Sequence, residues 1–275
     1  MDICDLYLYD LKTKFDKLDN KEAWYLSYSG GKDSHLLYWF IKEYLKDNKI
    51  AIIGINTYME HEEIRDRIYN NCDKVLLPTK KPFEIKEKYV IPCFSKEQDF
   101  YIYYYQKAIR EGRTPGKTYT DKIMGTYHTG YNISKKAREY VLSGDAHMIT
   151  HLCCHYLKKD PARQYERISG KKMILGVRSG ESTMRKRMYN SCFNKKKTVF
   201  TPLWDLTNEM EDKIYKKYNI KTPKVYEKVC RTGCMGCPYG SWKGDTQKEL
   251  ELTTGMQKEF IYEYFNESYK VLGIK

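Results

Sequence analysis

The sequence predicts an α/β protein, a doubly wound parallel sheet with a smaller cysteine-bearing region towards the C-terminus. Three observations lead to this prediction. Continuous apolar runs of strand length alternate with helical patterns, which is typical of a parallel sheet covered by helices on both faces. A glycine pair separates the first of these strands from its helix. Five of the nine cysteines gather in two short segments of the second half of the chain.

The elements of the predicted sheet follow one another in order. Residues 1–22 carry apolar side chains on one side of a helix. Strands and helices then alternate, because apolar runs and helical spacing take turns along the chain. The expected strands are residues 24–28, 50–56, 74–78 and 173–178, and the expected helices between the first three are residues 34–45 and 60–71.

The remaining segments are predicted to be mostly helical. Residues 98–111 have helical spacing and are expected to form a helix, although the aromatic run at residues 100–105 also suits a strand. Residues 112–117 form a cationic loop that either suits an anionic substrate or is a solvated surface loop. Thr207 is the predicted N-cap of a helix that runs through Tyr218. The residues beyond Gly244 form an amphipathic helical tail.

The composition limits the class of protein. The 275 residues carry a formal net charge of +13 and a mean hydropathy of -0.73. No apolar run is long enough to span a membrane, and no charged-then-apolar leader is visible. We therefore expect a soluble, unprocessed cytoplasmic protein that does not bind membranes. The positive charge favours polyanionic partners, and both nucleotides and nucleic acids qualify.

The segment after the first strand has the composition of a phosphate cradle. Two adjacent glycines allow positive φ values and bring backbone N–H groups close to an anion. Because the segment opens a helix, the orphan N–H groups and the helix dipole favour a phosphate. The serine hydroxyls and the lysine ammonium add further donors. The residues expected to bind a nucleotide here are Ser29, Gly30, Gly31, Lys32, Asp33 and Ser34.

Further candidates for nucleotide or substrate binding lie at the carboxyl ends of later strands. Asn56 and Thr57 end the second strand, where open α/β sheets place ligands, and a helix cap explains these two residues equally well. Arg178 ends the fourth predicted strand, and its forked guanidinium suits phosphate or sulfate. Glu181 and Arg185 follow in the same segment and are counted with the binding residues.

The clustered cysteines predict a metal centre in a reducing compartment rather than a disulfide framework. Thiolates are the ligands of iron–sulfur clusters, and a Cys-x-x-Cys turn offers two of them to one cluster edge. A four-thiolate zinc site satisfies the same spacing and is the alternative. The candidate metal ligands are Cys153, Cys154, Cys230, Cys234 and Cys237.

The other cysteines and the histidines near the cysteine pair are assigned less specific roles. His147, His151 and His155 fall four residues apart, so on a helix they line one face. We expect them to flank the cysteine pair or face solvent, with zinc binding as the alternative. Small buried side chains are expected at Cys4, Cys72, Cys93 and Cys192.

The glycine-containing hexapeptide resembles the PP-loop of the adenine nucleotide α-hydrolase superfamily, and its spacing differs from that of the Walker motif. The resemblance implies a Rossmann-like sheet, ATP and Mg²⁺ as cofactors, and cleavage between the α and β phosphates to give an adenylated substrate and pyrophosphate. Lys32 would neutralise the departing pyrophosphate, and Asp33 would hold Mg²⁺ or cap the helix. With Arg178 these are the predicted catalytic residues.

A second resemblance covers roughly residues 24–240. Five motifs follow the order seen in the phosphoadenosine phosphosulfate reductase family, namely residues 29–34, 153–158, 176–182, 202–207 and 232–238. In the adenylylsulfate reductases of that family a tandem cysteine pair and a Cys-x-x-Cys turn hold a four-iron cluster. The resemblance therefore implies the ligands Cys153, Cys154, Cys234 and Cys237. The chain also looks similar to the DNA phosphorothioation sulfurtransferase, and Cys230 would then replace Cys153.

Two departures from the sulfonucleotide reductases shape the functional hypothesis. Residues 266–275 lack the Glu-Cys-Gly-type nucleophile, and the loop keeps Lys32, which those enzymes tend to lose. We therefore expect an ATP-dependent enzyme with a [4Fe–4S] cluster that adenylates a substrate, with nucleic acid favoured, for sulfur transfer from a donor protein. The alternatives are a sulfonucleotide reductase whose nucleophile is Cys192 or comes from a partner, and a non-catalytic nucleic-acid-binding module with a zinc knuckle.

The predicted domain organisation follows from these motifs. Residues 1–22 form an N-terminal helix, residues 23–220 a PP-loop nucleotide-binding domain, and residues 221–275 a C-terminal cysteine motif and helix.

Overall fold

The computed structural model describes residues 2–181, 183–230 and 232–275, and the described chain divides into two compact units. Unit 1 consists of residues 1–56, 61–77 and 160–226, of which residues 1 and 182 lie outside the description. Unit 2 consists of residues 57–60, 78–159 and 227–275. This division differs from the predicted domain bounds, because residues 78–159 and 227–275 pack together although they are far apart in sequence.

Unit 1 is built on a five-stranded sheet in the order β3-β2-β1-β4-β5, and its strand pairings are parallel. The chain moves outward from the central strand to β3 and then returns to the other side of β1, as in a doubly wound sheet. The predicted fold class is therefore confirmed. The strands are β1 Trp24–Tyr28, β2 Ala51–Ile55, β3 Lys74–Leu76, β4 Lys172–Leu175 and β5 Val199–Phe200.

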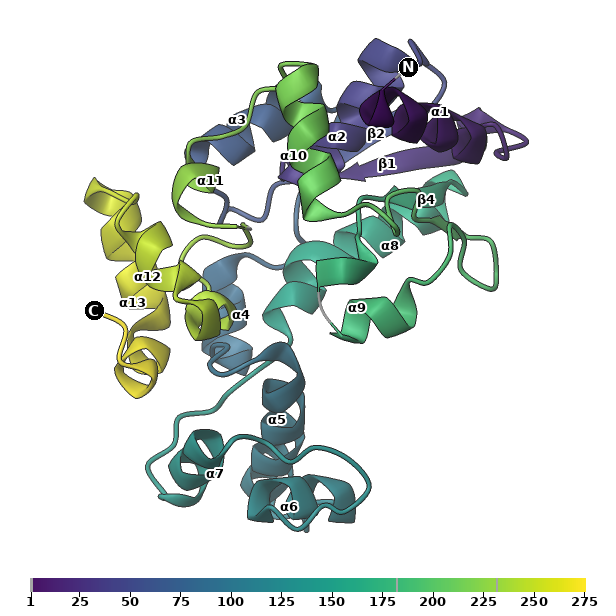
Figure 1. Ribbon diagram of the computed structural model, residues 1–275. Coiled ribbons are helices and arrows are strands. Elements are labelled where there is room, and N and C mark those ends of the chain that lie inside the picture. The colour runs from purple at the N-terminus through teal and green to yellow at the C-terminus, as the bar shows by residue number, and fades with distance from the viewer. Residues whose placement is uncertain (1, 182, 231) are drawn as a thin grey trace. The chain divides into compact units, whose positions relative to one another are not determined.

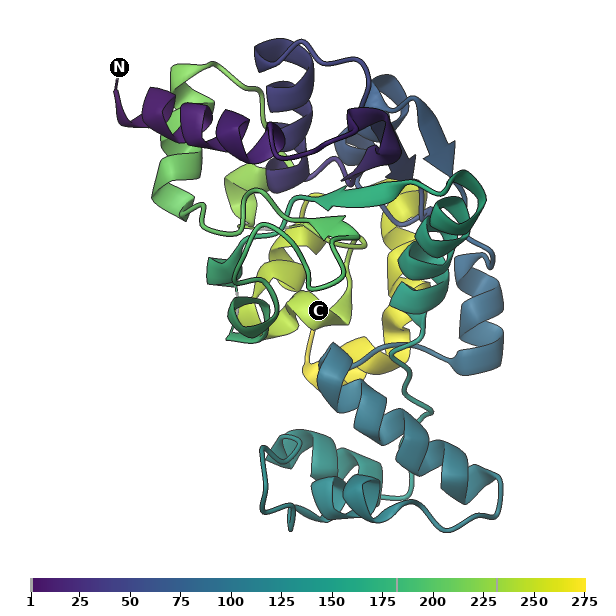
Figure 2. The ribbon, with the colours of Figure 1, turned by 90° about the vertical axis from the view of Figure 1, so that its right-hand side faces the viewer.

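Helices cover both faces of this sheet. In Figures 1 and 2, α1, α2 and α10 lie on one side and α8 lies on the other. Leu26 in β1 is fully buried in the main apolar core, whereas the neighbouring Tyr25 meets Tyr165 of α8 with ring centroids 5.0 Å apart. The helices of unit 1 are α1 Ile3–Phe15, α2 Lys32–Trp39, α3 Glu62–Asn71, α8 Asp160–Ser169, α9 Thr183–Met188 and α10 Asn208–Lys217.

Two predicted helices of unit 1 differ from the observed ones at their ends. The helix expected over residues 34–45 begins at Lys32, because Gly31 with extended backbone is its N-cap. From Phe40 to Tyr44 the helix continues as a wider π-turn. The helix expected over residues 1–22 ends at Phe15, and Asn20 caps a separate short turn, Lys21–Ala23. Thr207 does cap α10, since its side chain accepts a hydrogen bond from the N–H of Met210.

The regular elements of unit 2 are helical in its described part. Helices α5, α6 and α7 lie side by side (Figures 1 and 2) and share a core that includes Ile102, Ile123 and Ala137. The predicted helix at residues 98–111 and the helical tail beyond Gly244 are confirmed. The helices are α4 Pro82–Tyr89, α5 Lys96–Arg110, α6 Lys117–Met124, α7 Lys135–Leu142, α12 Asp245–Leu250 and α13 Gly255–Leu272, and α11 Val225–Lys228 joins the two units in sequence.

The histidine arrangement expected on one helix is wrong. His147 and His151 lie in irregular chain, and only His155 is in a helical segment, the π-turn His155–Lys159. The His147 side chain contacts a helix, because its Nδ1 lies 2.7 Å from the hydroxyl of Tyr140 in α7. The three imidazoles therefore do not share a helical face.

Among the described residues, none of the helices has the length and apolar character needed to cross a lipid bilayer.

Candidate functional site

The predicted phosphate loop connects the carboxyl end of β1 to the start of α2. Gly30 has φ +72°, a left-handed conformation that favours glycine, and a Cβ atom here would lie 3.0 Å from both Cγ2 and the carbonyl oxygen of Ile64. α3 therefore packs closely against the loop at Gly30, where a side chain would collide with Ile64. Gly31 caps α2 without a side-chain hydrogen bond, so the cap residue itself leaves the first N–H groups of the helix to other partners.

Two serine hydroxyls fix the shape of the loop. Ser34 Oγ accepts a hydrogen bond from the N–H of Ser29 at 3.2 Å and donates to the carbonyl of Gly31 at 3.0 Å. The hydroxyls of Ser29 and Ser34 lie 3.0 Å apart. The loop is thus closed across five residues by a side chain that is 4% exposed, and its form is set before any ligand arrives.

Lys32 is surrounded by side chains from α10 and α11. Its Nζ lies 2.9 Å from Asp212 Oδ1 and within 6 Å of the Tyr215 and Tyr226 ring centroids, at 5.5 and 5.9 Å. The N–H of Lys32 donates to the Tyr226 hydroxyl at 3.1 Å, and the Tyr215 hydroxyl donates to the carbonyl of Lys32 at 2.7 Å. The Tyr226 hydroxyl thus occupies a helix N–H that a phosphate oxygen would use.

Arg178 follows β4 and meets the loop at the point where the strand order reverses. Its Nε lies 2.5 Å from Asp33 Oδ1, and its Nη2 lies 3.4 Å from Glu211 Oε2. Gly176 makes this approach possible, because a Cβ there would lie 2.9 Å from the backbone nitrogen of Ser34. In doubly wound sheets ligands bind outside the carboxyl ends of the strands at this reversal. The structure therefore brings Arg178 to the predicted phosphate loop.

Glu211 is a residue of this site that sequence reasoning missed. It lies in the first turn of α10, is 2% exposed, and has its pKa raised to about 8 by burial and by the neighbouring charge of Asp33, partly offset by Arg178. In the sequence it reads as an ordinary acidic residue after the N-cap Thr207. No local pattern indicates that it faces Arg178 across the sheet edge.

The other predicted binding residues of unit 1 are Asn56, Arg185 and Glu181. Asn56 follows β2 as expected, and its amide donates to the Tyr69 hydroxyl at 2.8 Å. Arg185 lies on α9 and is partly buried. The backbone of Glu181 belongs to a short turn, Ser179–Glu181, while its side chain and residue 182 lie outside what the structure describes.

Four of the predicted metal ligands influence one another within unit 2. Cys153 donates to Cys154, which lowers the pKa of Cys154 to about 5 against the effect of burial, and the ammonium groups of Lys96, Lys158 and Lys159 act in the same direction. The same bond and burial raise the pKa of Cys153, and the charges of Cys234 and Cys237 add to that rise. Two remote segments thus bring thiols together beside three lysines.

The Cys234–Cys237 turn depends on the glycine inside it. Gly236 has φ +64°, and a Cβ there would collide with Ile261 and the Tyr269 hydroxyl of α13. The Tyr269 hydroxyl donates to the carbonyl of Gly236, and the Gly236 N–H donates to Glu249 at 3.2 Å. The Cys237 N–H closes the turn on the carbonyl of Cys234 at 3.1 Å. This turn is therefore set by long-range packing.

Thr57, a predicted binding residue, contacts the cysteine site. Its hydroxyl donates to Glu60 Oε1 at 2.5 Å and lies 3.9 Å from Cys234 Sγ. The charges of Cys234 and Cys154, with Glu60, raise the pKa of Lys158 against the effect of burial. Lys158 and Glu60 are further residues of this site that the sequence left unassigned. Cys234 itself has its pKa raised by burial, although Lys158 opposes the rise.

The remaining cysteines are spread through the molecule. All nine are free thiols, and Cys230 is exposed, unlike the four above. Cys4 and Cys93 are buried as expected, whereas Cys72 and Cys192 are only partly buried. Within residues 2–181, 183–230 and 232–275, no three His, Cys, Asp or Glu side chains converge closely enough to hold a single metal ion. An iron cluster spreads its thiolate ligands around several irons and does not require that convergence.

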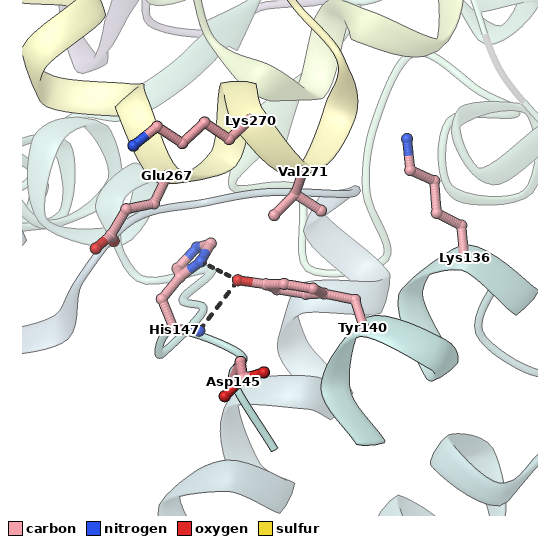
Figure 3. Close-up of a pocket in the computed structure, with 7 residues that line it drawn as sticks. All are labelled: Lys136, Tyr140, Asp145, His147, Glu267, Lys270 and Val271. Atoms are coloured by element: carbon pink, nitrogen blue, oxygen red, sulfur yellow. Dashed lines mark hydrogen bonds between the residues drawn. The ribbon is translucent and has the colours of Figure 1, made fainter. Parts of the chain in front are cut away.

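A pocket of about 470 Å³ lies elsewhere in unit 2 (Figure 3). The Tyr140 hydroxyl accepts from the backbone N–H of His147 at 3.1 Å and lies 2.7 Å from His147 Nδ1. Two lysines and two carboxylates balance the charge of its walls. None of the predicted site residues lines it, and its lining is Lys136, Tyr140, Asp145, His147, Glu267, Lys270 and Val271.

Comparison with known proteins finds similarity among solved structures only. No family model matches the chain, and no curated protein matches it. A phosphoadenylyl-sulfate reductase from Candida auris in a phosphate complex shares 11% identity over 80% of this chain and 83% of its own, with a TM-score of 0.44. The U34-tRNA thiolase NcsA from Methanococcus maripaludis, with its [4Fe–4S] cluster, shares 13% identity over 98% of this chain and 77% of its own, with a TM-score of 0.42.

A third similar structure is the NH₃-dependent NAD synthetase from Campylobacter jejuni in complex with nitrate. It shares 11% identity over 98% of this chain and 96% of its own, with a TM-score of 0.37. At these identities the similarity concerns the fold.

Proposed function

We propose that this protein is an ATP-dependent PP-loop enzyme that adenylates an acceptor so that sulfur can replace an oxygen. The observation that carries the proposal is the arrangement at the reversal of strand order, where the preformed loop, Lys32 and Arg178 converge. An anion of high charge is what such a site would bind. In the proposed step an acceptor oxygen attacks the α phosphorus, the bond to the β-phosphate oxygen breaks, and pyrophosphate leaves.

Nucleotide binding would exchange the present partners of the loop for phosphate oxygens. Asp212 is 67% exposed in its side chain, so its ion pair with Lys32 is a weak competitor for a triphosphate. The Tyr226 hydroxyl would release the Lys32 N–H in the same exchange. Lys32 would then stabilise charge on the departing pyrophosphate, the role in which a fixed cation contributes most to rate.

Asp33 is the residue that would hold Mg²⁺, since its carboxylate provides the hard oxygen ligand this ion prefers. The alternative role as a helix cap is not the observed one, because Gly31 is the cap and the Asp33 carboxylate pairs with Arg178. Arg178, released from Asp33, would be available to the α phosphate or the acceptor.

Cys153, Cys154, Cys234 and Cys237 fit an iron–sulfur cluster by their chemistry. They are four free thiols that act on one another inside one unit, and adjacent lysines favour a thiolate at Cys154. When bound, a cluster would supply sulfide or an iron-held sulfur for transfer. We leave Cys230 out of this ligand set because it is exposed. A sulfur-donor protein and a nucleic-acid acceptor are part of the proposal.

The test is product analysis with radiolabelled ATP, Mg²⁺ and total cellular RNA or sheared DNA as acceptor. We expect pyrophosphate and AMP, and a loss of at least about 100-fold in rate for Lys32→Ala. The matched control is Lys213→Ala, an exposed lysine paired with Glu209 on α10, which should keep the rate. Release of ADP and phosphate, or of sulfite from adenylylsulfate with a thiol reductant, would overturn the proposal; the second result would establish a sulfonucleotide reductase.

A further inference from the structure

An aromatic surface lies on unit 2 near the cysteine pair. We name it the aromatic cluster, and its members are Phe100 and Tyr104 of α5, Tyr119 of α6, and His151. The Phe100 ring centroid lies 4.9 Å from that of Tyr104 and 5.0 Å from that of His151. Tyr104 and Tyr119 are stacked with centroids 5.5 Å apart and planes 27° from parallel. The rings thus form one continuous group.

The aromatic cluster remains accessible to solvent. Phe100 is 36% exposed, and the other three members are partly exposed. A folding core would bury such rings, since each offers a large apolar area. Lys96, Phe100 and Tyr104 follow one another at intervals of four residues, so they share one face of α5.

A second group of tyrosines in the same unit forms a cage that already holds a cation of the protein. Lys122 is 3% exposed, and its Nζ lies 4.5, 4.1 and 4.4 Å from the ring centroids of Tyr101, Tyr127 and Tyr131. That cage is filled by the protein's own cation. Among the described residues, no lysine or arginine is found over a ring of the aromatic cluster.

The charges around the aromatic cluster are positive, and the cluster lies near the cysteine pair in the chain. Lys96 begins α5, Lys117 begins α6, and both are exposed. His151 belongs to the aromatic cluster and lies two residues before Cys153 in the chain. Residues 96–142 contain nine lysines and arginines and five acidic residues. An anionic backbone would be attracted to this part of the molecule.

We propose that the aromatic cluster stacks bases of a single-stranded nucleic acid while Lys96 and Lys117 hold its phosphates. Exposed aromatic rings flanked by cations are the features that bind single strands without reading their sequence. A duplex keeps its bases stacked inside, so it would use only the charges. The inference rests on the proposed function and specifies its acceptor as an unpaired segment of nucleic acid near the thiols.

The experiment measures fluorescence anisotropy when the full chain is added to a labelled single strand of about 20 nucleotides, as RNA and as DNA, and to the matching duplex. We expect the single strand to bind more tightly than the duplex. Tyr104→Leu should weaken single-strand binding about tenfold and leave duplex binding unchanged, whereas Tyr104→Phe should retain both. The control is Tyr9→Ala, a tyrosine of α1 that is 61% exposed and should have no effect.

The outcomes separate this inference from the function on which it rests. Equal binding of both forms, or equal losses for Tyr104→Leu in both, would overturn the inference, because charge alone would then explain binding. If Tyr104→Leu melts at the temperature of the parent yet keeps single-strand affinity, the inference is also wrong. Pyrophosphate release with a small-molecule acceptor, together with equal binding of single strand and duplex, would uphold the enzyme while refuting this surface. Single-strand binding without ATP cleavage would support the surface and refute the enzyme.

Discussion

The two candidate sites are constructed in different ways. In unit 1 the loop, Arg178 and Glu211 stand at the ends of parallel strands or the starts of helices, and their charges are paired with one another. In unit 2 Cys153 and Cys154 begin a helical segment, whereas Cys234 and Cys237 lie in a short turn, and lysines stand beside Cys154. The first site is therefore produced by a repetitive fold, whereas the second depends on individual contacts between remote segments.

This contrast predicts different kinds of failure. A substitution in the phosphate site removes a charge or a hydrogen-bond donor while the strands and helices that carry the site stay in place. It should therefore reduce ligand binding and reaction rate more than stability. A substitution in the cysteine site removes either a ligand or a packing contact, so it should affect metal content and folding together. The following predictions test this contrast.

The largest effect is expected for the thiols themselves. Cys154→Ser should abolish iron and acid-labile sulfide in anaerobically purified protein, because a serine hydroxyl does not replace a thiolate. Cys230→Ser should keep both, since Cys230 is exposed and lies outside the proposed ligand set. The measurement is iron and sulfide content with visible absorbance. Equal iron content in the two variants would assign the cluster to other residues, and zinc in place of iron would favour the zinc alternative.

Next in size is the glycine of the cysteine turn. Gly236→Ala should cost about 2–4 kcal/mol in unfolding free energy, because the new methyl meets buried side chains of α13 and φ is positive. Gly112→Ala is the matched control, since Gly112 has φ +65° and open space around it, and should cost about 1 kcal/mol. Denaturant melts measure both. Equal costs would show that packing against α13 does not shape the turn.

A smaller effect is expected from the buried carboxyl of the phosphate site. The pKa of Glu211 is raised to about 8, from an ordinary 4.5, so the folded state binds a proton that the unfolded state releases between these values. Stability should therefore fall as pH rises from about 4.5 to about 8. Glu211→Gln should raise the melting temperature at pH 8.5 by about 3 °C, and Glu209→Gln, on the same helix and exposed, should not. A pH dependence that survives in Glu211→Gln would contradict this assignment.

The smallest effect concerns the hydroxyl that occupies the loop. Tyr226→Phe removes the acceptor of the Lys32 N–H and should tighten ATP binding about two- to fivefold, the size of one neutral hydrogen bond. Tyr215→Phe is the comparison, because that hydroxyl donates to the carbonyl of the same lysine and does not compete with phosphate. Titration calorimetry decides between them. Weaker ATP binding in Tyr226→Phe would give Tyr226 a direct role in holding the nucleotide.

The fold of unit 1 could be predicted because its signals are local. Apolar runs of strand length and helical spacing are properties of neighbouring residues, and the four strands expected from them were found as β1 to β4. The structure of the hexapeptide could likewise be predicted from its own residues, since the glycine that allows positive φ and the helix that follows lie within a few positions. The observed helix ends differ from the predicted ones where another residue is the cap, as Gly31 is for α2.

The parts that were not predicted depend on contacts between distant residues. Glu211 and Asp212 reach the loop only because α10 packs beside the start of α2 and Arg178. The position of Thr57 in unit 2, the dispersal of the three histidines and the role of Gly236 are likewise results of packing. Spacing along the chain contains no information about these distances.

The division into units has a consequence for biosynthesis. The chain passes between them five times, at residues 56–57, 60–61, 77–78, 159–160 and 226–227. A ribosome delivers the last piece of unit 1 with residue 226, whereas Cys153 and Cys154 must wait for Cys234 and Cys237. Under the proposed function, the nucleotide site would thus be synthesised completely before the cysteine site, and neither unit can be produced alone by trimming the gene at a single point.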